Sequence, residues 1–353
     1  MGHPTIENLT PFAFAPLFIA DEEGRPIVVT IVKGTFDVSA EGAVTLAEEQ
    51  IDIDFAGTPY GDPAKSSYRL EPETAFIKLA TDCALLGHAV SPSPRIQMHV
   101  SFRVGPVSKT VRVTGDRVFK KGFWGASISS TTRFEKVPLI YERAFGGWDR
   151  TAKKEAHHSC EPRNPVGVGF AARHGKLVPD SPLPNVEDPR RPLTKFRGRS
   201  TPAGFGFISP DWQPRAQYAG TYDEAWTKNR APLLPKDFDR RFFQAASPGL
   251  VAPGYLRGDE EVEVTGTTPE GRWAFQVPRL AAPQCTVVTR FGADRELTTN
   301  LDTVIVDSDA RRLILIWRTY TELRSGPHDV SAMTITSANA PAPIVVGASR
   351  NTF

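Results

Sequence analysis

Few side chains in this sequence could bind a metal ion, and most of them stand alone. His157, His158 and Cys160 form the densest group. Zinc sites usually combine two such ligand pairs at set spacings, but Cys83 and Cys285 are isolated and have no C-x-x-C partner. The sequence therefore favours a solvated loop at this position, and we expect neither a bound metal nor a cofactor.

Two pairs of carboxylates have a spacing that could serve glycoside hydrolysis, which needs an acid and a base on either side of the bond. Asp302 and Asp307 lie in one strand-to-turn segment, where their side chains tend toward opposite faces. Glu142 and Asp149 bracket a Gly-rich turn. A carbohydrate- or peptidoglycan-active β-sandwich hydrolase using Glu142 and Asp149 is therefore the alternative function. An ion pair of Glu142 with Arg143 or another arginine is the simpler interpretation.

Signals for nucleophilic catalysis or phosphate binding are weak. The sequence contains no G-x-S-x-G motif, and no cysteine stands in a recognisable nucleophile context. Residues 164–170 contain G-x-G but lack a third glycine, a Lys-Ser/Thr pair and a following helix, so a tight turn is the better interpretation. We therefore expect no catalytic residues and no enzymatic activity.

Positive charge is concentrated in residues 190–199, where five of ten side chains are basic. Three interpretations are open for such a segment: a solvated loop, a contact for an acidic protein, or a contact for nucleic acid. The whole chain has 42 Lys and Arg against 40 Asp and Glu, a formal net charge of +2. This balance argues against nucleic acid and against an anionic membrane as partners.

Several features predict a cytoplasmic protein. No apolar run reaches the roughly 18 residues of a membrane-spanning helix. The first residues lack a basic segment followed by an apolar one, so no signal peptide is expected. Three widely spaced cysteines do not form a disulfide framework and fit a reducing compartment.

The elements that must position these side chains are predicted to be mainly β. The 353 residues include 31 prolines and 28 glycines, which suit short strands and ordered loops and exclude an all-α protein. We expect an antiparallel β-sandwich or barrel-like sheets with a long loop-rich central section and few short helices. The regions are an N-terminal β region at 1–120, a loop-rich aromatic section at 121–260 packed on the sheets, a C-terminal β region at 261–324 completing the same fold, and an Ala/Pro-rich segment at 325–353 that is a tail or a late-docking strand.

Period-two patterns place individual strands. A hairpin is predicted at 16–38 around the turn at 21–24, and a second strand pair within 71–90 around Thr81 and Asp82. Residues 95–104 alternate apolar and polar, and 83–119 is typical of a three-stranded meander. Helical turns are predicted near 222–227 and 239–246. The strands of the third section are predicted at 261–265, 272–277, 285–291, 296–306 and 311–320.

The aromatic side chains among the central loops indicate a protein interface, because Trp, Tyr and Arg dominate such surfaces. We expect some of these aromatic side chains to order the loops and others to contact a partner protein. Tyr141–Arg143 followed by Gly146 is predicted to form a structural turn, and Asp302 with Arg318 a cross-strand ion pair. The candidate partner-binding residues are Trp124, Tyr141, Arg143, Trp148, Arg197, Trp212, Tyr222 and Trp226.

Short segments in a fixed order across about residues 5–320 carry a further signal. They are NLTPF (8–12), KLATD (78–82), GHAVSP (87–92), VTGDR (113–117), PLIYERAFGG (138–147), RNPVG (163–167), LPNVE (183–187), AGTYD (219–223), LPKDFD (234–239), LDT (301–303) and WR (317–318). In this order the chain resembles a bacterial domain-of-unknown-function family encoded beside type VI secretion effectors, in operons with VgrG spike and PAAR tip proteins.

The resemblance implies an effector-specific adaptor or chaperone. Such a protein would hold a toxic effector in the cytoplasm, keep its spike-attaching part soluble and help load it onto the VgrG–PAAR tip. It implies no enzymatic activity and transfers no catalytic residues. The expected partners are the cognate effector and the VgrG spike or PAAR tip protein, with no nucleic acid and no membrane. Some relatives carry extra C-terminal modules, which are missing here, so this chain is expected to act in trans. A structural part of the injected spike is a third possibility.

Overall fold

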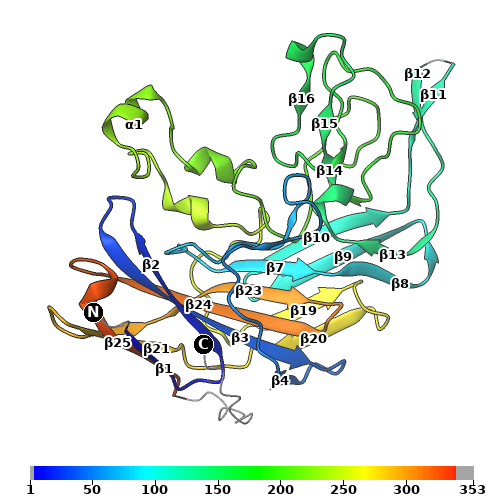
Figure 1. The fold of residues 1–353 in the computed structure, drawn as a ribbon. Coiled ribbons are helices and arrows are strands. Elements are labelled where there is room, and N and C mark those ends of the chain that lie inside the picture. The colour runs from blue at the N-terminus through cyan, green and yellow to red at the C-terminus, as the bar shows by residue number, and fades with distance from the viewer. Residues whose placement is uncertain (1–3, 124, 339–353) are drawn as a thin grey trace.

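The computed structural model describes residues 4–123 and 125–338, and strands dominate among them (Figure 1). The largest sheet has six strands in the order β2-β3-β24-β23-β7, with β4 paired to β3. These strands are β2 (Ala13–Ala20), β3 (Pro26–Val38), β4 (Val44–Leu46), β7 (Asp82–Leu86), β23 (Asn300–Asp307) and β24 (Arg312–Glu322). The predictions of a mainly β fold and of the first hairpin are confirmed.

Two further sheets complete the main body. The five-stranded sheet consists of β18 (Val186–Glu187), β10 (Val107–Thr114), β9 (Gln97–Val104), β19 (Glu261–Thr265) and β20 (Arg272–Gln276), in that order. The four-stranded sheet consists of β1 (Thr5–Asn8), β25 (Val330–Thr336), β21 (Gln284–Thr289) and β22 (Arg295–Thr298). In the three sheets of the main body most pairs are antiparallel, but β1–β25 and β23–β7 are parallel.

The remaining elements are short. Paired strands are β5 (Thr58–Pro59) with β6 (Tyr68–Leu70), β8 (His88–Arg95) with β13 (Phe134–Pro138), β11 (Phe119–Gly122) with β12 (Gly125–Ile128), β14 (Phe145–Gly146) with β17 (Val168–Gly169), and β15 (Trp148–Asp149) with β16 (Ser159–Cys160). The described chain has one α-helix, α1 (Glu224–Asn229). The 3-10 helices are η1 (Tyr141–Arg143), η2 (Glu155–His157), η3 (Arg215–Tyr218), η4 (Arg240–Phe243) and η5 (Pro327–Asp329). Both predicted helical turns therefore exist.

The main core lies between the six-stranded and five-stranded sheets. Val32 and Leu85 on one sheet share a buried cluster with Val100, Phe102 and Val264 on the other. The predicted alternation along β9 produces this arrangement, because every second side chain points into the core. Removing these apolar surfaces from water is the main force that joins the sheets. In the described chain neither sheet closes on itself.

The six-stranded sheet is buried on its other face as well. Ile27, Ile31 and Ile314 pack there against Phe76 and Phe207, which lie in loops. The sequence of a strand that is covered on both faces is a continuous run of apolar residues rather than an alternation of apolar and polar ones. This explains the sequence of β3, whose residues are nearly all buried.

A buried charge cluster lies on this second face. Its members are Lys33, Glu71, Glu73, Lys78, Asp82, Arg215, Asp302 and Arg318, all less than a tenth exposed. Lys78 Nζ lies 2.6 Å from Glu71 and 2.8 Å from Asp82. Arg318 lies 3.3 Å from Asp302, so the predicted cross-strand pair is confirmed. Four positive and four negative side chains balance, which buried ions require to offset their lost hydration.

Three strand predictions are wrong for reasons visible in the structure. The strand predicted at 296–306 is divided at Thr299, because β22 pairs with β21 in one sheet and β23 pairs with β24 in another. Residues 71–81 form no strand, because Glu71, Glu73 and Lys78 hold this segment in the charge cluster. The meander at 83–119 is also wrong, although β9 and β10 do pair. β8 pairs with β13 outside this sheet, and the other neighbour of β9 is β19, which begins more than 150 residues after β9 ends.

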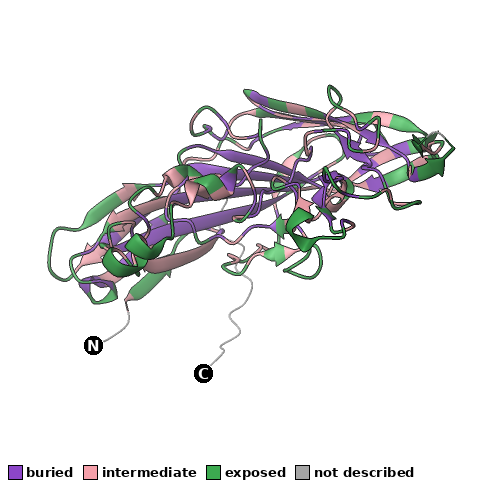
Figure 2. Cartoon of the chain, turned by 90° about the horizontal axis from the view of Figure 1, so that it is seen from above, coloured by how far each residue is buried: buried purple, intermediate pink, exposed green. Residues whose placement is uncertain are grey.

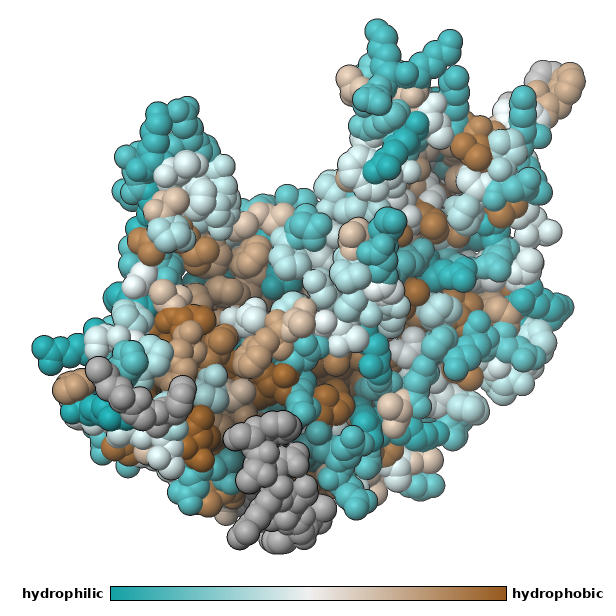
Figure 3. Space-filling view, in the orientation of Figure 1, coloured by the Kyte–Doolittle hydropathy of each residue, from teal (hydrophilic) through white to brown (hydrophobic). Residues whose placement is uncertain are grey.

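Two projections rise from the sheets in Figure 1. We call residues 219–243, which contain α1, the helical projection, and residues 117–200, which contain β11, β12 and β14–β16, the loop lobe. The loop lobe has its own small core of Phe119, Phe145, Leu183 and Leu193. Figure 3 shows a hollow between the projections with apolar side chains near its base. Buried residues concentrate on the central strands, and exposed residues gather on the loops (Figure 2).

The segment after residue 324 contains a docked strand. β25 pairs with β1 on one side and with β21 on the other. The alternative of a late-docking strand is thus correct for 330–336, and residues 339–353 lie outside the described part. No helix in the described residues combines the length and apolarity needed to cross a bilayer.

Candidate functional site

A hydrogen-bonded turn sets the geometry of the loop lobe. After η1 the chain passes through Gly146 and Gly147, which has a φ of 96°. The buried Asn164 side chain donates to the carbonyl oxygens of Tyr141 (2.8 Å) and Phe145 (3.1 Å). Gly147 N donates to Asn164 O at 2.8 Å. The predicted structural turn is confirmed, and the G-x-G segment serves as its partner.

Trp148 follows this turn and is 53% exposed. The Arg150 guanidinium lies 4.9 Å from the centre of its ring. The indole borders a pocket of about 990 Å³, which is bounded by residues 63–66 of one loop and 209–212 of another. A large aromatic side chain is thus presented by a rigid turn at the foot of the loop lobe.

The helical projection presents a second aromatic group. Asp223 caps α1 by accepting a hydrogen bond from Trp226 N at 2.7 Å. Tyr222, 53% exposed, packs edge-on against Trp226, with ring centres 4.7 Å apart. Trp226 Nε1 donates to Leu233 O, which fixes this ring pair on its own segment. The two rings therefore pack together at the N-terminal end of α1, with Tyr222 just before the helix and Trp226 within it.

Two of the predicted partner-binding residues are buried. Tyr141 and Trp212 are each 3% exposed and pack edge-on, with ring centres 5.6 Å apart. The Tyr141 hydroxyl donates to Ser247 Oγ at 2.8 Å. Their rings order the loops and leave little area for a partner. Trp124 lies outside the described residues.

The two predicted arginines contact their own chain. Arg143 Nη1 donates to Asn185 Oδ1 at 3.2 Å and lies 3.6 Å from Asp116. Arg197 donates to Gly175 O and lies over the Phe196 ring. Both arginines are nevertheless partly exposed, so contact with a partner stays a prediction for them.

The carboxylates considered for hydrolysis are bound by local groups. Glu142 accepts hydrogen bonds from Ser67 N (2.6 Å) and Ser67 Oγ (2.8 Å). Among the described residues it pairs with neither Arg143 nor another arginine, and Arg143 faces Asp116 instead, so the predicted ion pair is wrong. Asp149 accepts from the backbone of Thr151 and Ala172. Burial opposes its ionisation, but the hydrogen bond from Thr151 Oγ1 at 2.6 Å and these two backbone donors outweigh that effect and hold its pKa below the usual range.

Replacing Asp149 by asparagine is expected to lower the free energy of unfolding by about 1–3 kcal/mol at pH 7, because the charged acceptor is lost. The folded pKa lies below the unfolded value of about 3.9. The carboxylate therefore stabilises the fold above about pH 4, and this contribution disappears as the pH falls through the folded pKa. Denaturant unfolding at several pH values should show the two proteins converging in acid. Asp211→Asn, at an exposed position, should change little.

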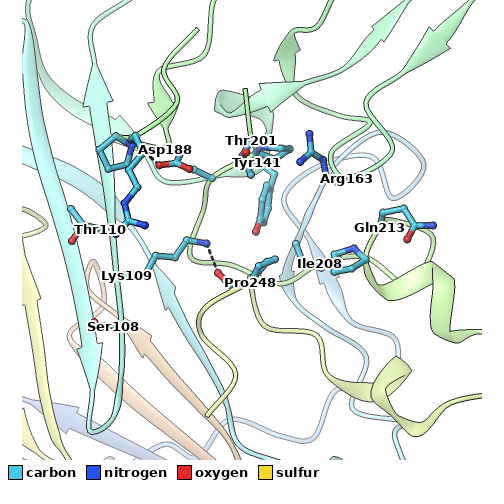
Figure 4. A pocket seen from close by; sticks show the side chains of 15 residues that line it. Ser108, Lys109, Thr110, Tyr141, Arg163, Asp188, Thr201, Ile208, Gln213 and Pro248 are labelled. Atoms are coloured by element: carbon cyan, nitrogen blue, oxygen red, sulfur yellow. Dashed lines mark hydrogen bonds between the residues drawn. The ribbon is translucent and has the colours of Figure 1, made fainter. Parts of the chain in front are cut away.

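A second pocket, of about 420 Å³, lies beside β10 (Figure 4). Lys109 reaches into it from the strand and donates to Ser247 Oγ (2.6 Å) and Pro248 O (3.0 Å). Burial lowers the pKa of Lys109 to about 8, which the nearby Asp188 carboxylate partly opposes. The lining of this pocket also includes Tyr141 and four prolines: Pro189, Pro202, Pro214 and Pro248.

Sequence reasoning missed this pocket. Lys109 stands in an alternating strand, where a lysine is usually solvated. Its partners Ser247 and Pro248 come from a loop far along the chain. The one local signal is that Lys109 occupies the same face as Val107 and Val111, both buried. A charged residue in a row of buried apolar residues indicates either that the strand ends there or that the charge has polar partners inside the protein.

The histidine-rich segment has local contacts. His157 stacks on His174 with ring centres 4.3 Å apart, and His158 Nε2 lies 3.1 Å from Ala152 O. The described residues hold no group of three or more His, Cys, Asp or Glu side chains placed to bind a metal ion.

Comparison with known proteins gives one family. A family model described as "Uncharacterized protein conserved in bacteria (DUF2169)" matches residues 23–318. The match spans most of the two larger sheets and both projections. No curated protein matches the chain, and no solved structure matches it.

Proposed function

The chain belongs to DUF2169, a family of uncharacterized conserved bacterial proteins, and from this premise we propose that it is a non-enzymatic adaptor for a secreted toxin. It binds a type VI secretion effector in the cytoplasm, stabilises it and helps load it onto the VgrG–PAAR spike. The ordered segments from 8–12 to 317–318 support the link to such operons, because their resemblance covers nearly the whole chain.

The observation that carries the proposal is the pair of exposed aromatic groups on two rigid projections. Trp148 and Tyr222 are each 53% exposed and are held by turns, caps and ring contacts. Rigid aromatic anchors supply much of the binding energy of protein interfaces. A preorganised surface of this kind loses little entropy on binding, which favours capture of a large partner.

The chemistry of the candidate carboxylates supports a binding role over hydrolysis. Both oxygens of Glu142 accept hydrogen bonds from Ser67, and Asp149 is held ionised by its own loop. In the hydrolase alternative Asp149 would be the general base, which must be free to accept a proton. Its oxygens instead accept hydrogen bonds from Thr151 and Ala172, and its lowered pKa makes it a weak base.

The test is co-expression with the effector encoded beside this protein, followed by affinity capture. Trp148→Ala and Tyr222→Ala are each expected to weaken binding about 10- to 30-fold, as loss of an aromatic anchor usually does. Phe291→Ala is the matched control, because Phe291 is 61% exposed but lies between β21 and β22. Isothermal titration calorimetry of the purified pair gives the three affinities.

Three outcomes would contradict the proposal. The first is an effector that is equally soluble and abundant without the protein and is not captured by it. The second is a measurable hydrolysis of carbohydrate or peptidoglycan that Glu142→Gln abolishes, which would establish the alternative function. The third is recovery of this chain as a component of secreted spike particles, which would assign it to the injected structure.

A further inference from the structure

The β10 edge is open where the Lys109 pocket begins. β18 pairs only with Arg112 and Val113 of β10, and Thr114 N donates to Asn185 O just beyond them. No other strand of the described chain pairs with β10 on that side. Ser108 and Thr110 both line the pocket. The five-stranded sheet therefore has an unfinished edge facing a preformed cavity.

The backbone at this edge is oriented for strand addition. In an antiparallel ladder, alternate residues point their N–H and C=O groups toward opposite neighbours. Because Thr114 N points toward β18, the N–H and C=O of Thr110 and Ser108 point to the same side, away from β9. An extended peptide that continues the line of β18 would meet these groups as its hydrogen-bond partners.

The pocket offers this peptide an unpaired cation. The Lys109 ammonium has three donors, of which Ser247 Oγ and Pro248 O accept two. No carboxylate of the described chain lies within ion-pair distance of it, whereas Arg163 in the same pocket is bonded to Glu161 at 2.6 Å. Lys109 is half-buried, and a partly desolvated charge without a counter-ion is unfavourable, so an incoming anion would be stabilised there.

The walls of the pocket suit a short extended segment rather than a helix. Four prolines and Ile208 give them an apolar, conformationally restricted surface. Asp188 is the one carboxylate in the lining, and its Oδ1 accepts a hydrogen bond from Arg190 N. Because Arg163 is already paired with Glu161, the remaining charges in the lining are Lys109 and Arg190 against Asp188, and this excess favours an acidic ligand.

We propose that an extended polypeptide segment of the partner adds to the open edge of β10 beside β18 and places an Asp or Glu carboxylate against the free donor of Lys109. Main-chain hydrogen bonds to Ser108 and Thr110 supply affinity, and the Lys109 pocket supplies the preference for an acidic side chain. This inference states which chemical groups the adaptor recognises in its partner. It rests on the proposed adaptor function only in taking that partner to be the effector.

The test uses the purified full-length protein and capped synthetic peptides. The probe is acetyl-Thr-Val-Glu-Val-Thr-amide, and its matched control has Gln in place of Glu. We expect the Glu peptide to bind at least about tenfold more tightly than the Gln peptide, since one hydrogen bond to a charged group is at stake. Lys109→Met should abolish this difference, and Lys136→Met, at an exposed lysine of β13, should preserve it.

Two further arms separate strand addition from binding of a free acid. A Glu peptide methylated on its backbone nitrogens should bind much more weakly, because it cannot pair with the edge. Glutarate should bind far more weakly than the peptide. In the unaltered protein, NMR of labelled lysine should show the pKa of Lys109 rising from about 8 when the Glu peptide binds, so the affinity falls above that pH. The other titratable groups that face this pocket are Asp188, Arg163, Arg190 and Tyr141.

Equal binding of the Glu and Gln peptides, glutarate binding as tight as the peptide, or no peptide binding at millimolar concentration would each overturn the inference. The lysine NMR titration needs no variant, so the inference stays falsifiable if Lys109→Met fails to fold. Failure of the peptides together with successful capture of the effector would refute this inference alone. Failure of both would refute the adaptor function as well.

Discussion

Replacing Lys78 by methionine is expected to lower the free energy of unfolding by about 3–5 kcal/mol, the usual effect of removing one partner from a buried ion pair. Lys78 Nζ lies within 2.8 Å of both Glu71 and Asp82, and all three side chains are buried. Methionine fills a similar volume but leaves these two carboxylates with one cation fewer. Denaturant unfolding at pH 7 measures the loss.

Lys228→Met is the matched control for this change. Lys228 also pairs with a carboxylate, Glu224, at 2.7 Å, but both side chains are more than two-thirds exposed. Exposed pairs of this kind contribute about 0.5 kcal/mol or less. A similarly small effect of Lys78→Met would mean that water or protonation of Asp82, whose pKa burial raises, already relieves the charge.

Replacing Gly147 by alanine is expected to cost about 3 kcal/mol or more and to release the base of the loop lobe. Gly147 has a φ of 96°, which L residues rarely adopt, and an added Cβ would lie 2.3 Å from Gly167 O. The strain and the collision act together, because the obstructing atom is backbone and cannot rotate away. Thermal unfolding measures the loss of stability, and protease cleavage within residues 117–200 measures the release of the loop lobe.

Gly249→Ala separates the two contributions. Gly249 has a φ of 90°, but no atom lies within 4 Å of its added Cβ. The alanine there carries only the backbone penalty, about 1–2 kcal/mol. Equal losses at both positions would show that the loop lobe shifts to accept the methyl group. In that case the turn would not hold Trp148 in a fixed position.

Local patterns predicted the parts of the fold that depend on neighbouring residues. The hairpin of β2 and β3 and the strands β19, β20 and β24 follow from apolar runs separated by turns. The turn before Gly146 and the ion pair of Asp302 with Arg318 were also predictable. In each case the partners are close in sequence or lie on strands joined by a short turn.

Features that need distant partners were not predictable. The charges at 71–78 are typical of solvated strand or loop positions, and their burial depends on Arg215 and Arg318. β18 is two residues long and joins β10 only because the loop lobe folds back. The Lys109 pocket likewise needs Ser247 and Pro248. The order of residue types within any one of these segments does not indicate these long-range contacts.

The placement of β25 between β1 and β21 determines the order in which the four-stranded sheet can form. Thr5 lies opposite Ala332 in a parallel pair, so β1 cannot pair until a strand more than 300 residues later has been synthesised. Pairing over such a sequence separation is slow. The nascent chain therefore leaves the edges of β1 and β21 open until β25 emerges, and open edges of this kind are prone to aggregation.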